Sequence, residues 1–231
     1  MQTQRFLRLE ALLGEQALQR LETSRVAVVG VGAVGGFCLE ALARSAVGSF
    51  LLLDNDTFEP SNANRQIGAL ESTMGVYKTK ALEARVKDIN PEASVTTVEA
   101  FLDESNLDLV FSYKPDLIID AIDSLASKAC LLNEALKRSV KVVSAMGAAR
   151  KTDAQSFRIA DLQDTTVCPL ARRLRTMVKG RGITAVYSVE PARSMSESFL
   201  SSAVWVTGSA GLYMAQAAVS ILIQDSVSDK D

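Results

Sequence analysis

The chain has 231 residues, of which 48% are hydrophobic and 23% charged, and its formal net charge is -2. These values are ordinary for a soluble globular protein with one domain and a large core, and the charge excludes a globally basic nucleic-acid binder. The sequence has no histidine, which excludes Ser-His-Asp and Cys-His triads and imidazole zinc sites.

The three cysteines also limit the kinds of site that the chain can hold. Cys38, Cys130 and Cys168 lie far apart and form no CxxC pair, so we expect neither a zinc cluster nor a disulfide framework. The N-terminus carries no signal-peptide pattern. Together these features indicate a cytoplasmic protein that works in a reducing compartment.

Residues 4–23 predict a short polar arm followed by an amphipathic helix. Its apolar positions are Phe6, Leu7, Leu12, Leu13, Leu18 and Leu21. Arg5 and Arg8 lie outside this apolar pattern, and their simplest explanation is that they are solvated charges.

The next segment predicts a strand, a glycine turn and a helix. An apolar run from Val26 ends at Gly30, and Gly30, Gly32 and Gly35 form GxGxxG before a helical pattern begins. Such a turn lets the backbone approach a phosphate at a helix N-terminus. A second strand, 49–53, ends at Asp54, where an acid can accept hydrogen bonds from ribose hydroxyls. The unit therefore predicts a nucleotide site without identifying the nucleotide.

The following segments alternate between helices and buried strands. After a polar loop at 59–67 we expect helices at 78–90, 107–111 and 127–138 and strands at 95–98, 117–122 and 141–145. The fourth strand should end in Asp123-Ser124. This order predicts an α/β, doubly wound, Rossmann-like and mostly parallel sheet with a C-terminal extension. We expect one domain over 1–231, made of an arm (1–24), a nucleotide-binding core (25–149) and a terminal segment (150–231).

The terminal segment has two unusual stretches. Residues 150–193 contain nine basic and four acidic side chains, and a helix from 172 to 181 carries Arg172, Arg173, Arg175, Lys179 and Arg181. A basic block is usually a solvated face, but this one could follow a phosphate backbone. Residues 201–224 contain no charge and nearly match a membrane span. Their small residues favour a buried strand and helix or an interface helix, so we expect no stable membrane insertion and leave peripheral membrane association open.

The residues after Asp54 decide between two kinds of nucleotide. A nicotinamide-binding module explains GxGxxG and Asp54 but gives no role to the loop Ser61–Gln66 or to Lys78. ATP explains them, because Arg65 and Lys78 can neutralise phosphates while Asn62, Asn64 and Gln66 donate neutral hydrogen bonds. Asp123 can then hold Mg²⁺ bridging phosphate oxygens. The alternative role for Asp123 is a helix N-cap, for which Ser124 and Ser127 are equally suitable.

GxGxxG, LLLDND, the NxNRQ loop with its following lysine, and IDAID together resemble the adenylating superfamily. This group contains the ThiF/MoeB/HesA proteins and the ubiquitin-activating enzymes, and the similarity runs from about Arg5 to Gly147. It implies that a substrate carboxylate attacks the α-phosphate of ATP and gives an acyl adenylate. The cofactor-binding residues that we expect are Gly30, Gly32, Gly35, Asp54, Asp56, Asn62, Asn64, Arg65, Gln66, Lys78, Asp123 and Ser124, with Asp123 as the Mg²⁺ ligand.

The same resemblance implies a homodimer. Arg5-Phe-Leu-Arg8 resembles the RYxR arm of the family, whose second arginine reaches the γ-phosphate bound by the neighbouring subunit. Arg8 is therefore expected to act with Arg65, Lys78 and Asp123 in catalysis. Which of Asp54 and Asp56 is the main ribose ligand stays open, as does a bound monovalent cation. The sequence departs from the family at Ala33, where many members have a third glycine.

The second half indicates the branch of the family. Val167–Arg175 and Ala185–Pro191 resemble the tRNA threonylcarbamoyladenosine dehydratases, and this similarity covers nearly the whole chain. It implies that the threonyl carboxylate beside the anticodon is adenylated and that the neighbouring ureido group closes on it, with net loss of water. The basic helix would then bind tRNA, with Arg150 and Lys151 as additional contacts.

Three features of this branch stay open or differ. Adenylation of a ubiquitin-like or sulfur-carrier protein is the alternative, although the paired CxxC ligands of many such enzymes are missing, and a sulfur-transfer partner is conceivable. Ala185 replaces a cysteine of some members, so we expect no covalent thioester, and Cys168 is expected to be a buried or loop thiol. The segment 192–202 is shorter than usual.

Overall fold

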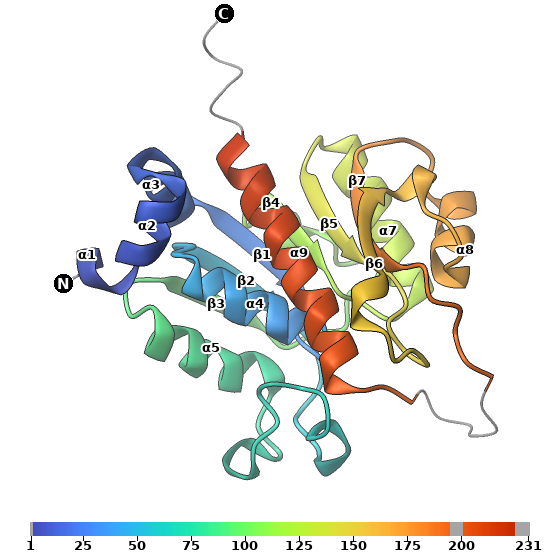
Figure 1. The fold of residues 1–231 in the computed structure, drawn as a ribbon, viewed down its shortest axis with the longest axis horizontal. Helices are drawn as coiled ribbons and strands as arrows, with labels where there is room; N and C mark the ends of the chain where they lie inside the picture. The colour runs from blue at the N-terminus through green and yellow to red at the C-terminus, as the bar shows by residue number, and fades with distance from the viewer. Residues whose placement is uncertain (1, 195–200, 225–231) are drawn as a thin grey trace, which may run out of the picture.

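The computed structural model describes residues 2–194 and 201–224 and is built around one twisted sheet (Figure 1). Its seven strands follow the order β3-β2-β1-β4-β5-β7-β6. Six of them run parallel: β1 (Arg25–Val29), β2 (Ser49–Leu53), β3 (Ser94–Val98), β4 (Leu117–Asp120), β5 (Lys141–Ala145) and β7 (Ile183–Ser188). The edge strand β6 (Phe157–Asp161) is antiparallel to β7. The predicted fold class is confirmed.

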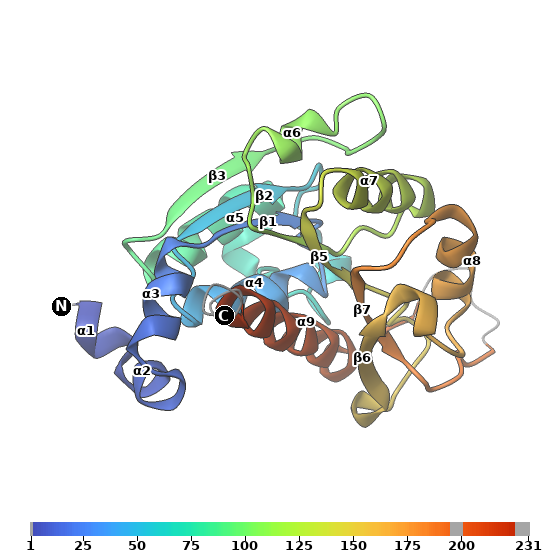
Figure 2. The ribbon, with the colours of Figure 1, turned by 90° about the horizontal axis from the view of Figure 1, so that it is seen from above.

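Helices cover both faces of this sheet. One face carries α3 (Glu15–Thr23), α4 (Gly35–Arg44), α5 (Lys78–Ile89) and α9 (Val204–Gln224), and the other carries α6 (Asp108–Phe111), α7 (Leu125–Lys137) and α8 (Pro169–Met177). Figure 2 shows α4 and α9 on the side of the sheet opposite to α6 and α7. The N-terminal α1 (Gln2–Arg5) and α2 (Leu7–Leu13) precede α3, and four 3₁₀ turns occupy Pro60–Asn62, Glu71–Thr73, Ala154–Ser156 and Leu162–Asp164.

The two layers of helices explain why the strands are apolar throughout. Val28 and Leu52 pack into the core beneath α4 and α9, while their neighbours Val29 and Leu53 pack into the core beneath α7. Successive side chains of a strand point to opposite faces, and both faces are covered here. A continuous apolar run is therefore what the fold requires.

The order of the strands creates a crevice at one edge. From β1 the chain moves outward through β2 and β3, and then returns to β4 and β5 on the other side of β1. The carboxyl ends of β1 and β4 lie side by side, and the connections after them leave in opposite directions. An open α/β sheet binds its ligands at such a switch point.

The prediction of a short polar arm and one amphipathic helix over residues 4–23 is wrong in detail. The segment forms three helices, broken before α2 and again at Gly14, whose φ of 88° is left-handed. Leu18 and Leu21 of α3 reach the interior, whereas Leu7 and Leu12 are exposed. Apolar spacing alone did not show which turns of the segment face the sheet.

Three predicted boundaries also differ from the structure. The fourth strand ends at Asp120, so that Asp123 lies in the loop beyond it and not at the strand end. The next helix begins at Leu125, and the Ser124 hydroxyl caps it by accepting from the Ser127 N–H at 3.5 Å. The basic helix ends at Met177, four residues earlier than expected, because the chain then turns through Gly180 and Gly182, both with positive φ.

The uncharged stretch at the end of the chain forms α9, which packs in the core. The helix is long and apolar enough to cross a membrane by length and composition, but 56% of its most apolar window is buried inside the protein. Gly211 allows close contact with α4, because a Cβ there would lie 2.5 Å from the Val34 carbonyl oxygen. Of the predicted buried strand and helix, only the helix forms. Most of the segment 192–202, which is expected to be short, lies outside the described residues.

Candidate nucleotide site

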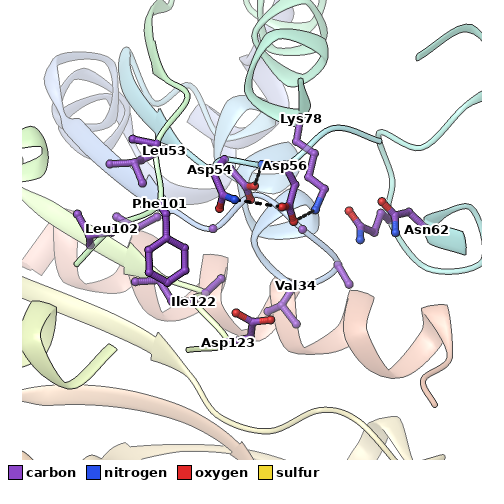
Figure 3. Close-up of a pocket in the computed structure, with 18 of the residues that line it drawn as sticks. Val34, Leu53, Asp54, Asp56, Asn62, Lys78, Phe101, Leu102, Ile122 and Asp123 are labelled. Atoms are coloured by element: carbon purple, nitrogen blue, oxygen red, sulfur yellow. Dashed lines mark hydrogen bonds and ion pairs between the residues drawn. The ribbon is translucent and has the colours of Figure 1, made fainter. Parts of the chain in front are cut away.

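A cavity of about 350 Å³ opens at the crevice between β1 and β4 (Figure 3). Its wall combines the glycine turn, the end of β2, the polar loop after it, the start of α5 and the loops after β3 and β4. Nine of the expected cofactor-binding residues line it: Gly30, Gly32, Asp54, Asp56, Asn62, Arg65, Gln66, Lys78 and Asp123. Residues separated by more than ninety positions in the sequence therefore meet in one cavity.

The glycine turn has almost no room for side chains. Gly30 has a φ of 85°, and a Cβ there would lie 2.7 Å from the Ala121 carbonyl oxygen. A Cβ at Gly35 would lie 1.9 Å from the Gly30 carbonyl oxygen, so Gly35 supports the turn from behind. Gly32 instead faces the cavity, where the nearest atom to an added Cβ is the side-chain oxygen of Gln66 at 3.9 Å. A ligand can therefore approach the backbone closely at Gly32.

Asp54 joins the glycine turn to the loop after β2. One carboxylate oxygen accepts the Val31 N–H at 2.8 Å, and the other accepts the Asp56 N–H at 2.9 Å. Burial raises the pKa of Asp54, against the opposing effects of these two backbone donors and of the Lys78 charge. Each oxygen retains a lone pair, so the carboxylate can accept further hydrogen bonds from a ligand's hydroxyl groups.

Lys78 is a buried cation at an unfavourable place. It is the first residue of α5, where the helix dipole opposes positive charge, and its side chain is only 7% exposed. Its ammonium group donates to Asp56 Oδ2 at 2.7 Å, while the Asp56 side chain remains 58% exposed. Burial and the helix dipole both disfavour a charge at this position, so the lysine does not stabilise the fold there. It does place a cation in the wall of the cavity (Figure 3).

The polar loop presents Arg65 with neutral partners. The guanidinium donates to the Ser61 carbonyl at 2.8 Å and to the Asn64 side-chain oxygen at 2.9 Å. Among the described residues Arg65 forms no ion pair, so its charge is available to an anion in the cavity. Asn64 itself lies outside the cavity wall and donates to the Ser202 carbonyl at 3.1 Å.

Two amides of this loop differ in their hydrogen bonding. The Asn62 side chain supports the loop by accepting from the Glu59 N–H and donating to the Ser61 hydroxyl, both at 3.3 Å. The Gln66 side-chain oxygen is buried and has no partner in the part of the chain that the structure describes. Such a group is costly unless a ligand satisfies it, and rotating the amide would point its NH₂ donor into the cavity.

Asp123 approaches the cavity from the loop after β4. Its side chain is exposed, and Figure 3 shows it beside Ile122 and Val34. Ser124, rather than Asp123, is the N-cap of α7, and Ser124 does not line the cavity. Asp123 is therefore not needed to cap the helix. Within residues 2–194 and 201–224, no group of three or more His, Cys, Asp or Glu is placed to hold a metal ion.

A buried network beneath this loop was missed by sequence reasoning. Asp120 and Lys128 are both fully buried, and Lys128 Nζ lies 2.7 Å from Asp120 Oδ2. The same oxygen accepts from the Ser144 hydroxyl at 2.6 Å, and Asp120 Oδ1 accepts from the Ile122 N–H at 3.2 Å. The network holds the turn that leads to Asp123. A lysine eight residues after an acid in a buried strand was the available signal.

An apolar wall was also missed. Ala100, Phe101 and Leu102 follow β3 and line the cavity, and the Phe101 side chain is exposed. Figure 3 shows Phe101, Leu102 and Ile122 at one end of the cavity and Lys78 and Asn62 toward the other. Since β3 is parallel to β2, its carboxyl end reaches the same edge, and this could have been expected. A cavity with one apolar end and one cationic end suits a base and its phosphates.

Arg8 lies far from the cavity of its own chain. It is exposed on α2, and the neighbouring Arg5 donates to the Ile89 carbonyl at the C-terminus of α5 at 2.7 Å. Lys78 is at the opposite end of that 12-residue helix, about 16 Å away along its axis. The structure therefore does not bring Arg8 together with Arg65, Lys78 and Asp123 of the same chain.

The expected tRNA-binding residues fall into two groups. Arg172, Arg173 and Lys179 are exposed, and no ion pair involves them among the described residues. Arg181 is paired with Asp164 at 2.6 Å, and Arg175 donates to the Thr165 hydroxyl at 2.6 Å. Among the described residues, an acid therefore neutralises Arg181, whereas the hydrogen-bond partners of Arg175 are neutral groups.

Two further residues of the second half are buried. Lys151 donates to the Glu190 carbonyl and is 5% exposed, so it is not free to bind a phosphate. Cys168 is 2% exposed and lies at the start of α8, where it packs with Ala171 and Leu174. This position agrees with a structural thiol.

Relatives of known function share this chain's sequence over most of its length. The tRNA threonylcarbamoyladenosine dehydratase of Bacillus subtilis is 45% identical over 178 residues, which are 77% of this chain and 70% of that protein. The molybdopterin-synthase adenylyltransferase of Escherichia coli is 33% identical over 150 residues, which are 65% of this chain and 59% of that protein.

The structures and a family profile agree with this similarity. The crystal structure of Escherichia coli tRNA N6-threonylcarbamoyladenosine dehydratase, TcdA, in complex with ATP matches with a TM-score of 0.93 at 32% identity. The match covers 99% of this chain and 97% of that chain. The ThiF family profile matches residues 3–230. With this extent of similarity, and with the family's motifs gathered at one cavity, the chain belongs to the ThiF family.

Proposed function

We propose that this protein is an ATP-dependent tRNA threonylcarbamoyladenosine dehydratase, which cyclises the modified adenosine beside the anticodon. The observation that carries the proposal is the cavity itself, in which Arg65, Lys78 and Asp54 converge at the switch point of the sheet. The similarity to dehydratases over three quarters of the chain supports this substrate.

Each end of the cavity suits a different part of ATP. Phe101 and Leu102 would contact the base, Asp54 would accept hydrogen bonds from the ribose, and Arg65 and Lys78 would hold the phosphates. The backbone at Gly32 would lie against the phosphates, and a rotated Gln66 amide could donate to them. Asp123 would hold Mg²⁺ through its carboxylate, and the ion would neutralise phosphate charge.

The reaction that we propose has two steps. The threonyl carboxylate attacks the α-phosphorus of ATP, and the bond to the β-phosphate oxygen breaks, releasing pyrophosphate. The ureido group of the same nucleoside then attacks the activated carbonyl, loses its proton and expels AMP with one carboxylate oxygen. The product has lost one water in total, and its oxygen leaves in AMP.

This chemistry suits a site without histidine or a cysteine nucleophile. The second step is intramolecular, so its effective concentration is high and no side chain needs to form a covalent link. Arg65 and Lys78 stabilise the charge that develops on the phosphates. The position that a thioester-forming cysteine takes in some relatives is Ala185, which is buried in β7.

Two surfaces outside the cavity complete the proposal. Arg172, Arg173 and Lys179 would contact tRNA phosphates, and Arg8 would reach the γ-phosphate bound by a second copy of the chain.

A mixture of Arg8→Ala and Lys78→Met proteins tests the dimer, because one of the two sites in a mixed dimer would carry both intact residues. We expect activity in the mixture and almost none in either variant alone.

The mass of the modified nucleoside tests the proposed function. The protein is incubated with ATP and tRNA that carries threonylcarbamoyladenosine, and the tRNA is digested to nucleosides. We expect a nucleoside lighter by one water, formed only with ATP and not by Lys78→Met. Pyrophosphate exchange that requires a protein ending in Gly-Gly and ignores tRNA would instead indicate adenylation of a sulfur carrier. An unchanged nucleoside mass with a verified substrate would refute the proposal.

A further inference from the structure

Trp205 is exposed but fixed in position. It is the second residue of α9, and 58% of its surface is accessible. The indole N–H donates to the Thr152 carbonyl at 2.9 Å, which satisfies its one polar group. The ring is therefore held at one edge while much of its surface faces water. An exposed, immobilised tryptophan is a rigid surface for another flat ring.

Three segments of the chain build the surroundings of this ring. The Arg193 N–H donates to the Arg150 carbonyl at 2.8 Å, and the Arg193 guanidinium donates to the Thr152 hydroxyl at 2.8 Å. The Arg150 N–H donates to the Ser201 carbonyl at 2.8 Å. We call the surface formed by Arg150, Thr152, Arg193 and Trp205 the indole platform.

The two neighbouring acids, Glu190 and Asp153, do not neutralise the positive charge of the indole platform. Glu190, from the segment that resembles the dehydratases, accepts the Thr152 and Asp153 N–H groups at 3.0 and 2.9 Å. Burial tends to raise the pKa of Glu190, but these donors and the Lys151 charge hold it below its usual value. The Asp153 carboxylate accepts from Gln155 and Ser156. Neither acid forms an ion pair with Arg150 or Arg193 among the described residues.

Arg150 has two further signs of a binding role. Its φ of 59° lies in the left-handed region, which is uncommon for a residue with a side chain. Its Nε is buried and has no hydrogen-bond partner within the described residues. Strained conformations and unsatisfied polar groups both cost stability, and they are concentrated at functional sites.

The indole platform lies next to the nucleotide cavity. Arg65 lines the cavity and donates to Asn64, and the Asn64 amide donates to the Ser202 carbonyl at 3.1 Å. Trp205 follows Ser202 by three residues, which span at most about 10 Å. A polymer bound on the indole platform could therefore place a neighbouring unit at the cavity.

We propose that the indole platform binds an unpaired nucleotide of RNA, with its base stacked on Trp205 and its phosphates held by Arg150 and Arg193. An aromatic ring with a guanidinium group close to it is the usual chemistry for recognising single-stranded RNA, and here Trp205 and the Arg193 guanidinium both donate to Thr152. The inference rests on the proposed function, because it identifies the surface that would present the flanking tRNA loop to the cavity.

The test uses the intrinsic fluorescence of the protein. Trp205 is the only tryptophan in the sequence, so its emission reports on this surface alone. The full chain is titrated with an RNA hairpin that carries the substrate's anticodon loop and with a fully paired RNA of the same length. We expect salt-sensitive quenching by the hairpin and little by the duplex. Trp205→Ala, whose binding is followed by the anisotropy of a labelled hairpin because the variant has no tryptophan, should raise the dissociation constant of the hairpin by about 5- to 100-fold.

Leu212→Ala is the matched control, because Leu212 is also on α9 and is 54% exposed. We expect this variant to bind the hairpin like the wild type and ATP binding to be unchanged in both variants. If the wild-type protein dehydrates its tRNA but its tryptophan emission does not change on adding RNA, this inference is refuted and the proposed function is not. Emission that changes with protein concentration and not with RNA would also refute it, because a second copy would then cover the ring. If the tRNA is never dehydrated, the proposed function fails, and quenching by the hairpin would still support an RNA-binding surface.

Discussion

Replacing Lys128 by methionine should destabilise the protein by about 3 kcal/mol. The substitution keeps most of the side-chain volume but removes the charge that lies 2.7 Å from the fully buried Asp120 carboxylate. Removing one partner of a buried ion pair costs about 3–5 kcal/mol, because the other charge is left in the interior. We expect the lower end of this range, since the Ser144 hydroxyl and the Ile122 N–H still donate to Asp120.

Urea unfolding followed by circular dichroism measures this change. For a chain of this size, about 3 kcal/mol corresponds to a melting temperature lower by roughly 6–12 °C. The double variant Asp120→Asn/Lys128→Met removes both charges and should recover at least half of the loss, because a neutral pair needs no buried counter-charge. An m-value equal to that of the wild type would show that the unfolding transition is comparable.

Two results would contradict this reasoning. The first is a Lys128→Met protein within about 1 kcal/mol of the wild type. The second is a double variant that is no more stable than Lys128→Met, which would mean that packing and not charge explains the loss.

Three other substitutions test the cavity. Gly30→Ala should abolish ATP binding and lower the free energy of unfolding, because its Cβ would lie 2.7 Å from the Ala121 carbonyl oxygen. The control is Gly14→Ala, whose Cβ meets nothing within 4 Å. Its free energy of unfolding in urea should fall only by the roughly 1–2 kcal/mol that a side chain costs in the left-handed region. Lys78→Met should raise the dissociation constant of ATP about 10- to 100-fold by calorimetry, while the exposed Lys80→Met changes it by less than about twofold. Asp54 should impose a pH dependence, because its folded pKa is raised. As pH rises from 3.8 through the folded pKa of Asp54, the free energy of unfolding of the wild type should fall relative to that of Asp54→Asn. A difference between the two proteins that does not change with pH would contradict this.

The core of the fold could be predicted because local patterns and global structure agree there. The strands 49–53 and 141–145 have the predicted bounds, since continuous apolar runs bounded by turns have one stable placement in a two-faced sheet. The N-terminal segment could not be predicted as well. Its leucines are compatible with a single helix, and the break at Gly14 follows from how α3 packs on the sheet.

The cavity was predictable where its residues follow strands, and less so elsewhere. Asp54 was predicted from its position at the end of a strand and Lys78 because only a phosphate ligand gave its charge a role, and the structure brings both to one wall. Phe101 and the pair Asp120–Lys128 were missed, because an apolar residue after a strand and a lysine in a helix have ordinary alternatives. The structure shows that Phe101 faces the cavity and that the Asp120–Lys128 pair lies beneath the loop that leads to Asp123.

The position of α9 has a consequence for the biogenesis of the protein. The helix packs against α4, which belongs to the first strand–helix–strand unit, although more than 150 residues separate them in the sequence. Until α9 has left the ribosome, the apolar surface of α4 and of Val28 beneath it lacks its cover. The growing chain must therefore wait in a partly open state that holdase chaperones could recognise, and maturation can finish only after translation of the helix.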